Sequence, residues 1–170
     1  MGASFNEVPV AGLQMNPFVK IGKEWMLVTA GDASGYNTLT ASWGGFGVLW
    51  GRNVATCYIR PQRYTKRFLD AAERFTLSFY GEGYRDALTV LGTKSGRDGD
   101  KVAEVCFTPY FVDGTCAFEQ ADLVLVCRKL YVAQFEPDKF AVPGLADEVY
   151  PARDCSFMYI GEVERALERA

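Results

Sequence analysis

No histidine occurs among the 170 residues of this chain, and that absence excludes several classes of chemistry. A Ser-His-Asp triad and a Cys-His pair both need a histidine to activate the nucleophile. Histidine ligands for haem, or for a two-histidine, one-carboxylate iron centre, are equally missing. Any chemistry in this chain must therefore come from carboxylates, cysteines, lysines, tyrosines or a bound cofactor.

Cysteines are few, odd in number and without a C-x-x-C spacing; they are Cys57, Cys106, Cys116, Cys127 and Cys155. Scattered cysteines in a chain without histidine disfavour a zinc site, so we expect no bound metal. Cys57 and Cys127 lie in apolar segments, where a thiol behaves as a small hydrophobic group. For Cys155 we favour a structural role over a redox role, because neither of its neighbours in the sequence is a cation and no second thiol is close in sequence. This usage predicts a reduced, cytoplasmic protein.

Long apolar runs are also absent. No stretch of eighteen apolar residues occurs, so we expect no membrane span. The N-terminal MGASFNEVPVAGLQ lacks a basic region followed by an apolar one, which argues against a secretory signal. Its first six residues have a glycine at position 2, but Asn6 replaces the Ser or Thr that myristoylation prefers.

Strand-like segments dominate what the sequence does contain. Apolar residues make up 49% of the chain, and 17 glycines with few helical patterns favour a strand-rich single domain over residues 1–170, with its core at about 18–164. Alternation or apolar runs predict strands over Lys23–Ala30, Thr38–Trp43, Asn53–Ile59, Arg74–Phe79, Asp122–Phe135 and Phe157–Glu164. Two short helices are predicted, over Tyr64–Ala72 and Tyr84–Leu91.

The details of these elements can also be predicted. Thr65 is the nearest capping hydroxyl for the first helix, and Gly92 can close the second. The C-terminal RALERA is expected to be a polar tail. Because strands outnumber helices and do not alternate with them regularly, we expect a closed or partly open antiparallel barrel with a few peripheral helices.

A row of hydroxyls marks the first candidate site. In NTLTASWGG, which runs from residue 37 to residue 45, Thr38, Thr40 and Ser42 recur with a period of two. They therefore face one side of a strand. Small residues and glycines beside them would let a ligand approach the backbone closely. A solvent-facing threonine row is an equally good interpretation of these residues alone.

Positive charge marks the second candidate, although the chain as a whole carries a net charge of −3. The stretch YIRPQRYTKR contains no acidic residue and four cations, Arg60, Arg63, Lys66 and Arg67. Arg60 and Arg63 flank a predicted turn, and Thr65 opens a predicted helix, where cations, a hydroxyl and free N–H groups suit a phosphate. Charge alone favours a solvated surface patch instead.

The third candidate is the glycine loop SGRDGDK, from Ser95 to Lys101. It is not a Walker motif, because G-x-x-x-x-G-K-[ST] is absent, and a polar loop is the simpler interpretation. Taken together, two cationic elements and a hydroxyl-lined strand in a small barrel predict a socket for a phosphorylated, aromatic ligand. Nucleic acid fits less well, since the net charge is negative and the basic residues form no long stripe.

The order of four segments resembles the flavin reductase-like, flavoredoxin-type proteins. The segments are NTLTASWGGFGVLWGRNVATCYIRPQRYTKRFL, FTLSFYGEGYRDALTVLGTKSGRDGDK, ADLVLVCRKLYV and MYIGEV. The resemblance covers about Phe18 to Glu164, and the combination of TASWG, RPQRYT and SGRDGDK carries it. It implies a mainly β, Greek-key-like, FMN-binding split β-barrel that forms a homodimer with flavin sites near the subunit interface.

The resemblance also implies a set of cofactor-binding residues. Along the flavin ring and ribityl chain it places Thr40, Ala41, Ser42 and Trp43. At the phosphate end it places Arg60, Arg63, Tyr64 and Thr65. A closing loop, which the resemblance would allow to come from the partner subunit, contributes Ser95, Gly96, Arg97 and Lys101. No catalytic side chain is implied, because FMN carries the chemistry.

The missing histidine bears on the activity that the resemblance implies. Relatives often carry a histidine shortly before the last strand, on the nicotinamide or substrate side, and Ser156 takes that place here. The resemblance implies an oxidoreductase that passes hydride or electrons from NAD(P)H through FMN to flavin or another small-molecule or protein acceptor. Alternatives are an FMN-containing electron-transfer protein with little NAD(P)H reductase activity, and a barrel that binds without flavin.

Overall fold

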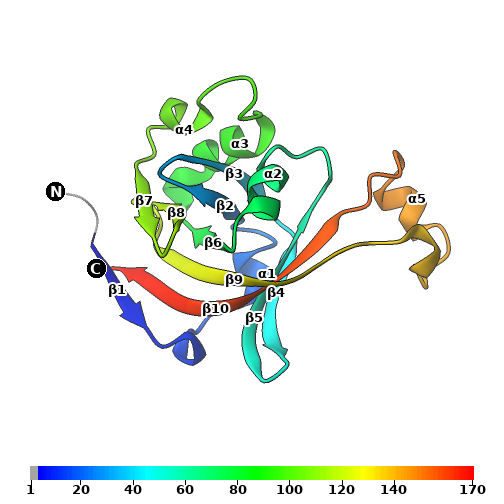
Figure 1. The fold of residues 1–170 in the computed structure, drawn as a ribbon, viewed down its shortest axis with the longest axis horizontal. Helices are drawn as coiled ribbons and strands as arrows, with labels where there is room; N and C mark the ends of the chain where they lie inside the picture. Colours follow the sequence, from blue (N-terminus) through cyan, green and yellow to red (C-terminus); the bar gives the residue numbers. More distant parts are fainter. Residues whose placement is uncertain (1–3) are drawn as a thin grey trace.

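A computed structural model describes residues 4–170 of the chain, which form a curled antiparallel sheet with short helices around it (Figure 1). The strands are β1 Phe5–Val8, β2 Met26–Asp32, β3 Gly35–Ala41, β4 Gly44–Leu49, β5 Arg52–Ile59, β6 Arg74–Phe79, β7 Pro109–Val112, β8 Thr115–Phe118, β9 Leu123–Gln134 and β10 Phe157–Arg169. The α-helices are α1 Pro17–Lys20, α2 Thr65–Ala71, α3 Arg85–Thr93, α4 Lys101–Glu104 and α5 Leu145–Val149. Three single turns of 3-10 helix are η1 Val10–Gly12, η2 Glu82–Tyr84 and η3 Pro137–Lys139. Gly2, on which acylation would depend, lies outside the described residues.

The strand order explains the barrel. Neighbouring strands pair in the order β3-β2-β6-β9-β10-β5-β4, with β1 added to the far part of β10. The end strands β3 and β4 are separated along the chain by only Ser42 and Trp43. The sheet must therefore curl until its ends meet at this corner, and within residues 4–170 no ladder joins β3 to β4. The result is a mainly antiparallel barrel that is split between these two strands.

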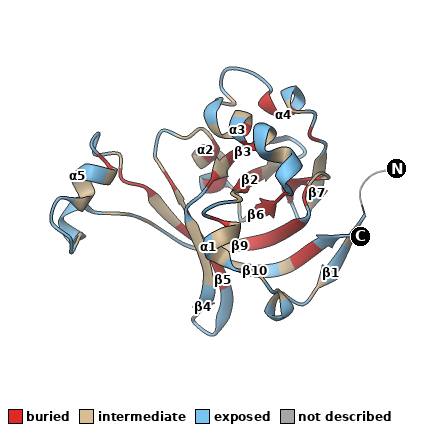
Figure 2. Cartoon of the chain, turned by 180° about the vertical axis from the view of Figure 1, so that it is seen from behind, coloured by how far each residue is buried: buried red, intermediate tan, exposed pale blue. Residues whose placement is uncertain are grey.

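Two apolar clusters pack on the two sides of this sheet. The inner cluster fills the barrel and includes Val28, Leu39 and Phe75. The outer cluster includes Leu27 and Leu88 and lies between the sheet, α3 and the β7–β8 hairpin. Successive residues of β2 alternate between the two clusters, as the period of a strand requires. Figure 2 shows the buried residues concentrated in the central strands, whereas the tip of the β4–β5 hairpin is exposed.

The bend of β10 allows this strand to pair with both β5 and β9. Its pairing with β9 shifts register between Ile160 and Gly161 and again between Val163 and Arg165, and such bulges bend a strand and increase its twist. At Gly161 an added Cβ would lie 2.8 Å from the Phe75 ring and 2.9 Å from the Cβ of Cys127. The barrel closes tightly here because position 161 has no side chain.

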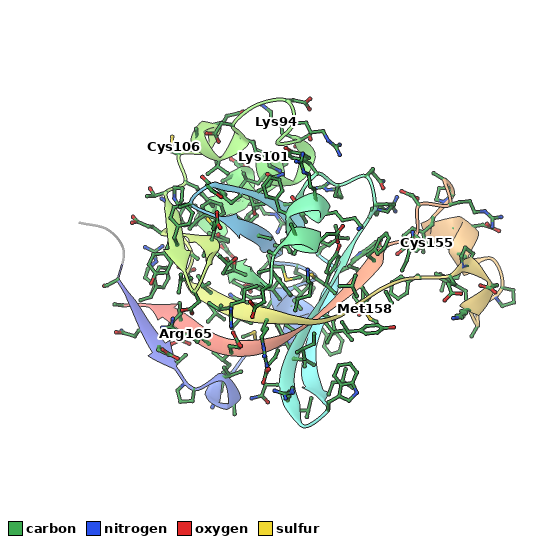
Figure 3. All side chains as sticks on the ribbon, in the orientation of Figure 1. Lys94, Lys101, Cys106, Cys155, Met158 and Arg165 are labelled. Carbon is green, nitrogen blue, oxygen red and sulfur yellow. The ribbon has the colours of Figure 1, made fainter. Side chains whose placement is uncertain are left out.

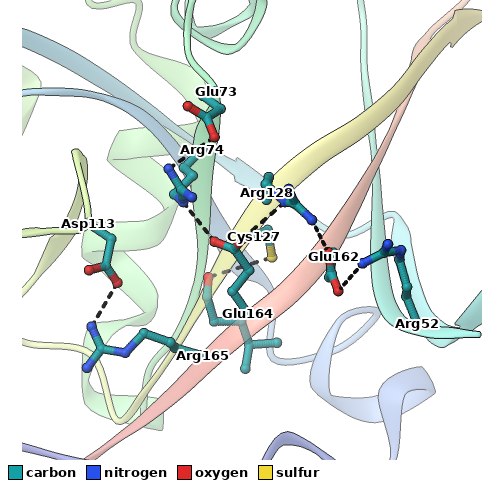
Figure 4. Close-up of polar contacts among 10 residues, drawn as sticks. Arg52, Glu73, Arg74, Asp113, Cys127, Arg128, Glu162, Glu164 and Arg165 are labelled. Atoms are coloured by element: carbon teal, nitrogen blue, oxygen red, sulfur yellow. Dashed lines mark hydrogen bonds and ion pairs between the residues drawn. The ribbon is translucent and has the colours of Figure 1, made fainter.

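A ladder of charges crosses the solvent-facing side of the sheet (Figure 4). Glu162 on β10 pairs with Arg52 of β5 at 2.8 Å and with Arg128 of β9 at 2.6 Å. Glu164 then pairs with Arg128 at 3.1 Å and with Arg74 of β6 at 2.7 Å. These side chains satisfy one another across four strands, so the ladder is a structural feature with no cation left over for a ligand.

Every predicted strand and both predicted helices overlap observed elements, but four details were wrong. RALERA is no tail: it extends β10, pairs with β1 and β9, and buries Ala166 and Leu167. Gly92 does not close α3, which runs on to Thr93. It packs instead so close to Thr40 that an added Cβ would lie 3.0 Å from the Thr40 Cβ.

The other two corrections concern hydroxyls. Thr65 does not cap α2; it is the first helical residue and is buried, and the N-cap is Tyr64, which makes no side-chain capping bond. The row formed by Thr38, Thr40 and Ser42 does not face solvent along its length. Thr38 is fully buried and its hydroxyl lies 2.8 Å from that of Thr29, so only the end of the row reaches a pocket.

The connection between β9 and β10, residues 135–156, is here called the strap. It contains η3 and α5 and projects away from the barrel, in orange at the right of Figure 1. Asp154 ties its end to the turn after β5 by accepting hydrogen bonds from Arg60 at 3.0 Å and from Gln62 at 2.6 Å. Within residues 4–170, no helix has the length and apolar character needed to cross a membrane.

Candidate functional site

Two small adjoining pockets bring the predicted site residues together. The first, here called the cationic pocket, has a volume of about 120 Å³ and is lined by Asn37, Gln62, Arg63, Tyr64, Thr65, Thr93, Lys94, Ser95, Gly96, Arg97 and Lys101. The second, here called the hydroxyl pocket, has a volume of about 160 Å³ and is lined by Leu39, Thr40, Ala41, Ser42, Trp43, Tyr58, Ile59, Arg60, Arg63 and Ser156. Arg63 lines both, so the two pockets form one continuous site. Each predicted site residue lines at least one of them.

The cationic pocket is built where the carboxyl end of α3 meets the turn before α2. Arg63 donates to the carbonyl oxygen of Gly92 at 2.9 Å. Lys101 donates to the carbonyls of Leu91 at 2.7 Å and Lys94 at 3.0 Å, and Figure 3 shows Lys101 and Lys94 at this end of the molecule. Cations suit the negative end of a helix dipole. The helix therefore explains why Arg63 and Lys101 are held here without an acidic partner.

Most of the charge in this pocket is not neutralised by an acid. Among residues 4–170, no Asp or Glu lines it, although four cations do, namely Arg63, Lys94, Arg97 and Lys101. Lys94 pairs with Glu104, which lies outside the lining, and the other three have no acidic partner among the described residues. Burial lowers the pKa of Arg63, and burial with the nearby charge of Arg63 lowers the pKa of Lys101 to about 8. Both shifts have the sign expected for cations removed from water with no counter-charge. An anionic ligand would reverse them.

A buried amide with no partner points into the same pocket. Asn37 is 5% exposed, and its Nδ2 has no hydrogen-bond partner among the described residues. An unpaired buried donor costs about 1–3 kcal/mol. The backbone of Gly96 packs against this amide so closely that an added Cβ would lie 2.7 Å from its Oδ1. Gly96 is therefore required by contact with Asn37, and a ligand acceptor would satisfy the free donor.

The hydroxyl pocket lies at the corner where β3 ends, and its hydroxyls differ in availability. Thr40 donates its hydroxyl to the carbonyl of Leu88 in α3, so that proton is committed. Ser42 and Trp43 are exposed at the corner. Ser156 is fully buried, lines the pocket, and has no hydrogen-bond partner for its Oγ among the described residues. Ser156 is therefore the free hydroxyl that a ligand would satisfy.

Arg60 occupies a different place from the one predicted. It does not line the cationic pocket; it lines the hydroxyl pocket instead. Its guanidinium pairs with Asp154 at 3.0 Å, donates to the carbonyl of Val149 at 2.9 Å, and stacks on the ring of Tyr150 at 5.2 Å. Three strap contacts already use this side chain, so we remove Arg60 from the proposed phosphate contacts.

Lys66 and Arg67 line neither of the two small pockets. The amine of Lys66 pairs with Asp70 at 2.7 Å and lies 3.8 Å from the centre of the Phe157 ring, and Arg67 is exposed. The basic stretch is thus divided by structure into a strap anchor, a pocket residue and two surface cations. Asn37, Tyr58 and Gln62 line the pockets although the sequence did not single them out. For Asn37, its place at the start of the NTLTASWGG stretch was the available signal.

A much larger apolar pocket adjoins the hydroxyl pocket. Its volume is about 920 Å³, and it shares Ser42, Trp43 and Tyr58 with the smaller pocket. The strap supplies its outer wall, through Phe135, Phe140, Leu145, Val149 and Tyr150. The whole site therefore runs from a cationic end, through a polar middle, to an apolar chamber.

The side chains in this site are suited to binding and orienting a ligand, and none of them is arranged as a catalytic group. Among the described residues no group of three Cys, Asp or Glu is arranged to hold a metal. Cys155 is buried and free, but it is not among the residues that line the two small pockets. An anion fits one end and a polar aromatic ring fits the middle.

Solved structures with the same fold include FMN-binding proteins. An FMN-binding domain of a flavin reductase-like enzyme from Shewanella baltica has a TM-score of 0.70 and 15% identity, covering 99% of this chain and 78% of its own. An FMN-binding protein from Thermus thermophilus, with bound 1-cyclohex-2-enone, has a TM-score of 0.68 and 21% identity over 96% of this chain and 80% of its own. Flavoredoxin from Methanosarcina acetivorans has a TM-score of 0.66 and 18% identity over 84% and 67%.

The TM-scores of these three structures show a shared fold, and no curated protein matches the sequence significantly. The family is established separately by a match to the family model. The model of the flavin reductase like domain matches residues 18–169, which is nearly the whole chain. The predicted split-barrel fold is thereby confirmed, and this chain belongs to the flavin reductase like domain family.

Proposed function

We propose that the chain binds FMN, with the phosphate in the cationic pocket and the flavin ring at the hydroxyl pocket. One observation carries this proposal: a pocket lined by no acid, with three cations that have no acidic partner and the unpartnered amide of Asn37, is joined through Arg63 to a pocket with the unpartnered hydroxyl of Ser156. A phosphate accepts from Arg63, Lys101 and the Asn37 amide. The family and its FMN-binding structural relatives support the same ligand.

The proposed activity is that of a flavoprotein oxidoreductase, which passes hydride or electrons from NAD(P)H to free flavin or another acceptor. FMN, when bound, would supply the redox chemistry, which no side chain of the site supplies. The chain itself would hold the phosphate, orient the ring at the β3–β4 corner, and limit water through the strap. Ser156 would meet a polar edge of the ring or of the substrate.

Reconstitution followed by anaerobic reduction tests this function. Protein incubated with FMN and then desalted should stay yellow, and NADH or NADPH should bleach it promptly in the absence of oxygen. A protein that cannot be loaded with FMN contradicts the binding proposal. A loaded protein that neither nicotinamide bleaches contradicts the reductase proposal alone.

An FMN-containing electron-transfer protein is the second candidate, and the charge of the apolar pocket favours it. The pyrophosphate of a nicotinamide dinucleotide needs cations. The one lysine that lines this pocket, Lys139, is paired with Glu136, and the described residues place no arginine there. Slow bleaching by NADH and NADPH with fast reduction by a reduced ferredoxin-type donor would select this function.

We also propose that two chains form a homodimer. Val48, on β4, and Trp50, at the tip of the β4–β5 hairpin, are 75% and 63% exposed. The Trp50 ring meets that of Tyr131, itself 48% exposed, edge-on at 6.5 Å. Contiguous exposed apolar side chains mark interaction surfaces. Light scattering should give twice the mass of the chain, and Trp50→Glu should give a single-chain mass.

A further inference from the structure

The apolar pocket is far larger than the two pockets assigned to FMN and has different chemistry. Its volume is about 920 Å³, which lies within the range of roughly 300–1,000 Å³ typical of small-molecule sites. Four aromatic residues follow one another along its inner and strap walls. Phe135 lies 5.6 Å from Tyr58 and 6.5 Å from Phe140, and Phe140 lies 6.3 Å from Tyr150, measured between ring centroids. Edges and faces of these rings suit an aromatic guest.

The same pocket offers no free charge. Its charged lining residues, Glu136 and Lys139, pair with each other. The nearby guanidinium of Arg60 does not line this pocket; it lies over the Tyr150 ring at 5.2 Å and is paired with Asp154. A charged guest would lose its hydration here without gaining a partner, which is costly. The pocket therefore selects against anions and cations alike.

The apolar pocket lies directly beside the proposed site of the flavin ring. Ser42, Trp43 and Tyr58 line both the apolar pocket and the hydroxyl pocket. A molecule in the apolar pocket would therefore share a wall with the flavin ring. The strap forms the far wall of the pocket, and Asp154 holds the strap in place through its hydrogen bonds to Arg60 and Gln62.

We propose that this pocket is a second ligand site that takes an uncharged aromatic small molecule and holds it beside the flavin ring. The position beside the flavin ring rests on the proposed FMN site, whereas the pocket itself is defined by its own lining residues. It names the class of substrate: a neutral aromatic compound, and neither a dinucleotide nor a charged aromatic acid. A second copy of the chain inserted into the pocket is the competing occupant.

Two naphthalenes that carry either a neutral hydroxyl or an anionic sulfonate at the same ring position test the proposal. Isothermal titration of FMN-loaded protein with 2-naphthol and with naphthalene-2-sulfonate should show binding of the neutral compound and at least tenfold weaker binding of the sulfonate. Equal affinities would overturn the proposal, as would failure of 2-naphthol to bind. If binding appears only after a dimer is dissociated by dilution, the second copy is the occupant and the proposal is wrong.

Two variants of the strap locate the binding. Leu145 lines the pocket, whereas Val142, three residues earlier, is exposed and lies outside it. Leu145→Lys should weaken 2-naphthol at least tenfold and shift the preference toward the sulfonate, and Val142→Lys should leave both affinities unchanged. Equal effects of the two variants would overturn the proposal. If FMN itself does not bind, the same titrations on flavin-free protein still decide the pocket, so the two failures are distinguishable.

Discussion

Arg63 is the residue on which the FMN proposal depends most directly, because it lines both small pockets. Its guanidinium has five N–H donors, and the hydrogen bond to Gly92 uses one nitrogen. One charge-assisted hydrogen bond to a phosphate contributes about 1.5–3 kcal/mol, which corresponds to roughly tenfold to a hundredfold in affinity. Arg63→Ala should weaken FMN binding by that factor.

Riboflavin, which lacks the phosphate, separates this loss from a general disturbance of the site. Arg63→Ala also removes the bond to Gly92, and any resulting shift of α3 would weaken both ligands. Quenching of flavin fluorescence gives both dissociation constants on the same protein. We expect the ratio of FMN to riboflavin affinity to fall by about tenfold or more, and an unchanged ratio would refute the phosphate assignment.

Two neighbouring arginines provide matched controls. Arg67 is exposed on α2, so Arg67→Ala should leave both affinities unchanged. Arg60 is held by Asp154 and Val149, so Arg60→Ala should change the affinities for FMN and riboflavin by the same factor. A selective loss of FMN affinity in Arg60→Ala would return this residue to the phosphate end.

Three further changes probe the same site and the barrel. Lys101 is charged below its pKa of about 8 and neutral above it, and the anion needs the charged form; FMN affinity measured against pH should therefore fall by up to about tenfold per unit above pH 8. Gly96→Ala places a Cβ 2.7 Å from Oδ1 of Asn37 and should cost one hydrogen bond, about 1 kcal/mol or fivefold in FMN affinity. Gly161→Ala places a Cβ 2.8 Å from the Phe75 ring and should lower the free energy of unfolding in urea by about 1–3 kcal/mol.

Each of these predictions has a control within the chain. Lys101→Met removes the charge but keeps a long side chain, and it should abolish the fall in affinity above pH 8; a persisting fall would assign the titration to another group. An added Cβ would meet no atom within 4 Å at Gly83 or at Gly47. Gly83→Ala should leave FMN affinity unchanged, and Gly47→Ala should leave the unfolding midpoint within the range of ordinary surface changes. A loss equal to that of Gly96→Ala or Gly161→Ala would remove the steric explanation.

Local pattern predicted the strands because alternation and apolar runs are properties of neighbouring residues. It failed at RALERA, where Ala166 and Leu167 are buried although the segment is rich in charge. Its two partner strands are β9 and β1, and β1 lies at the other end of the chain. Arg165 is neutralised by Glu7 and Asp113, which lie 158 and 52 residues earlier in the chain. A polar segment becomes a strand when distant residues supply its pairing and counter-charges.

The same distance effect limited the prediction of the site. Arg60 and Arg63 are equivalent as sequence, since both are cations beside a turn. Their difference comes from Asp154, which lies 94 residues beyond Arg60 and reaches it only through the strap. Asn37 was inconspicuous for a similar reason, because the loop that leaves its amide unpaired and covered lies around Gly96. Sequence motifs could identify the stretches that contribute to the candidate site. Which side chain of a stretch lines which pocket depends on contacts between residues that are distant in sequence.

The carboxyl end of α3 accounts for how an acidic protein keeps a cationic pocket without an anion. Buried cations need compensation, and carbonyl oxygens at the helix end supply part of it to Arg63 and Lys101. Carbonyls carry only partial charge, so the compensation is incomplete and the pKa of Lys101 stays low. An acidic side chain here would neutralise the pocket and compete with a phosphate. The helix end instead holds the cations in place and leaves their charge available, which is the arrangement that a binding site for an anion requires.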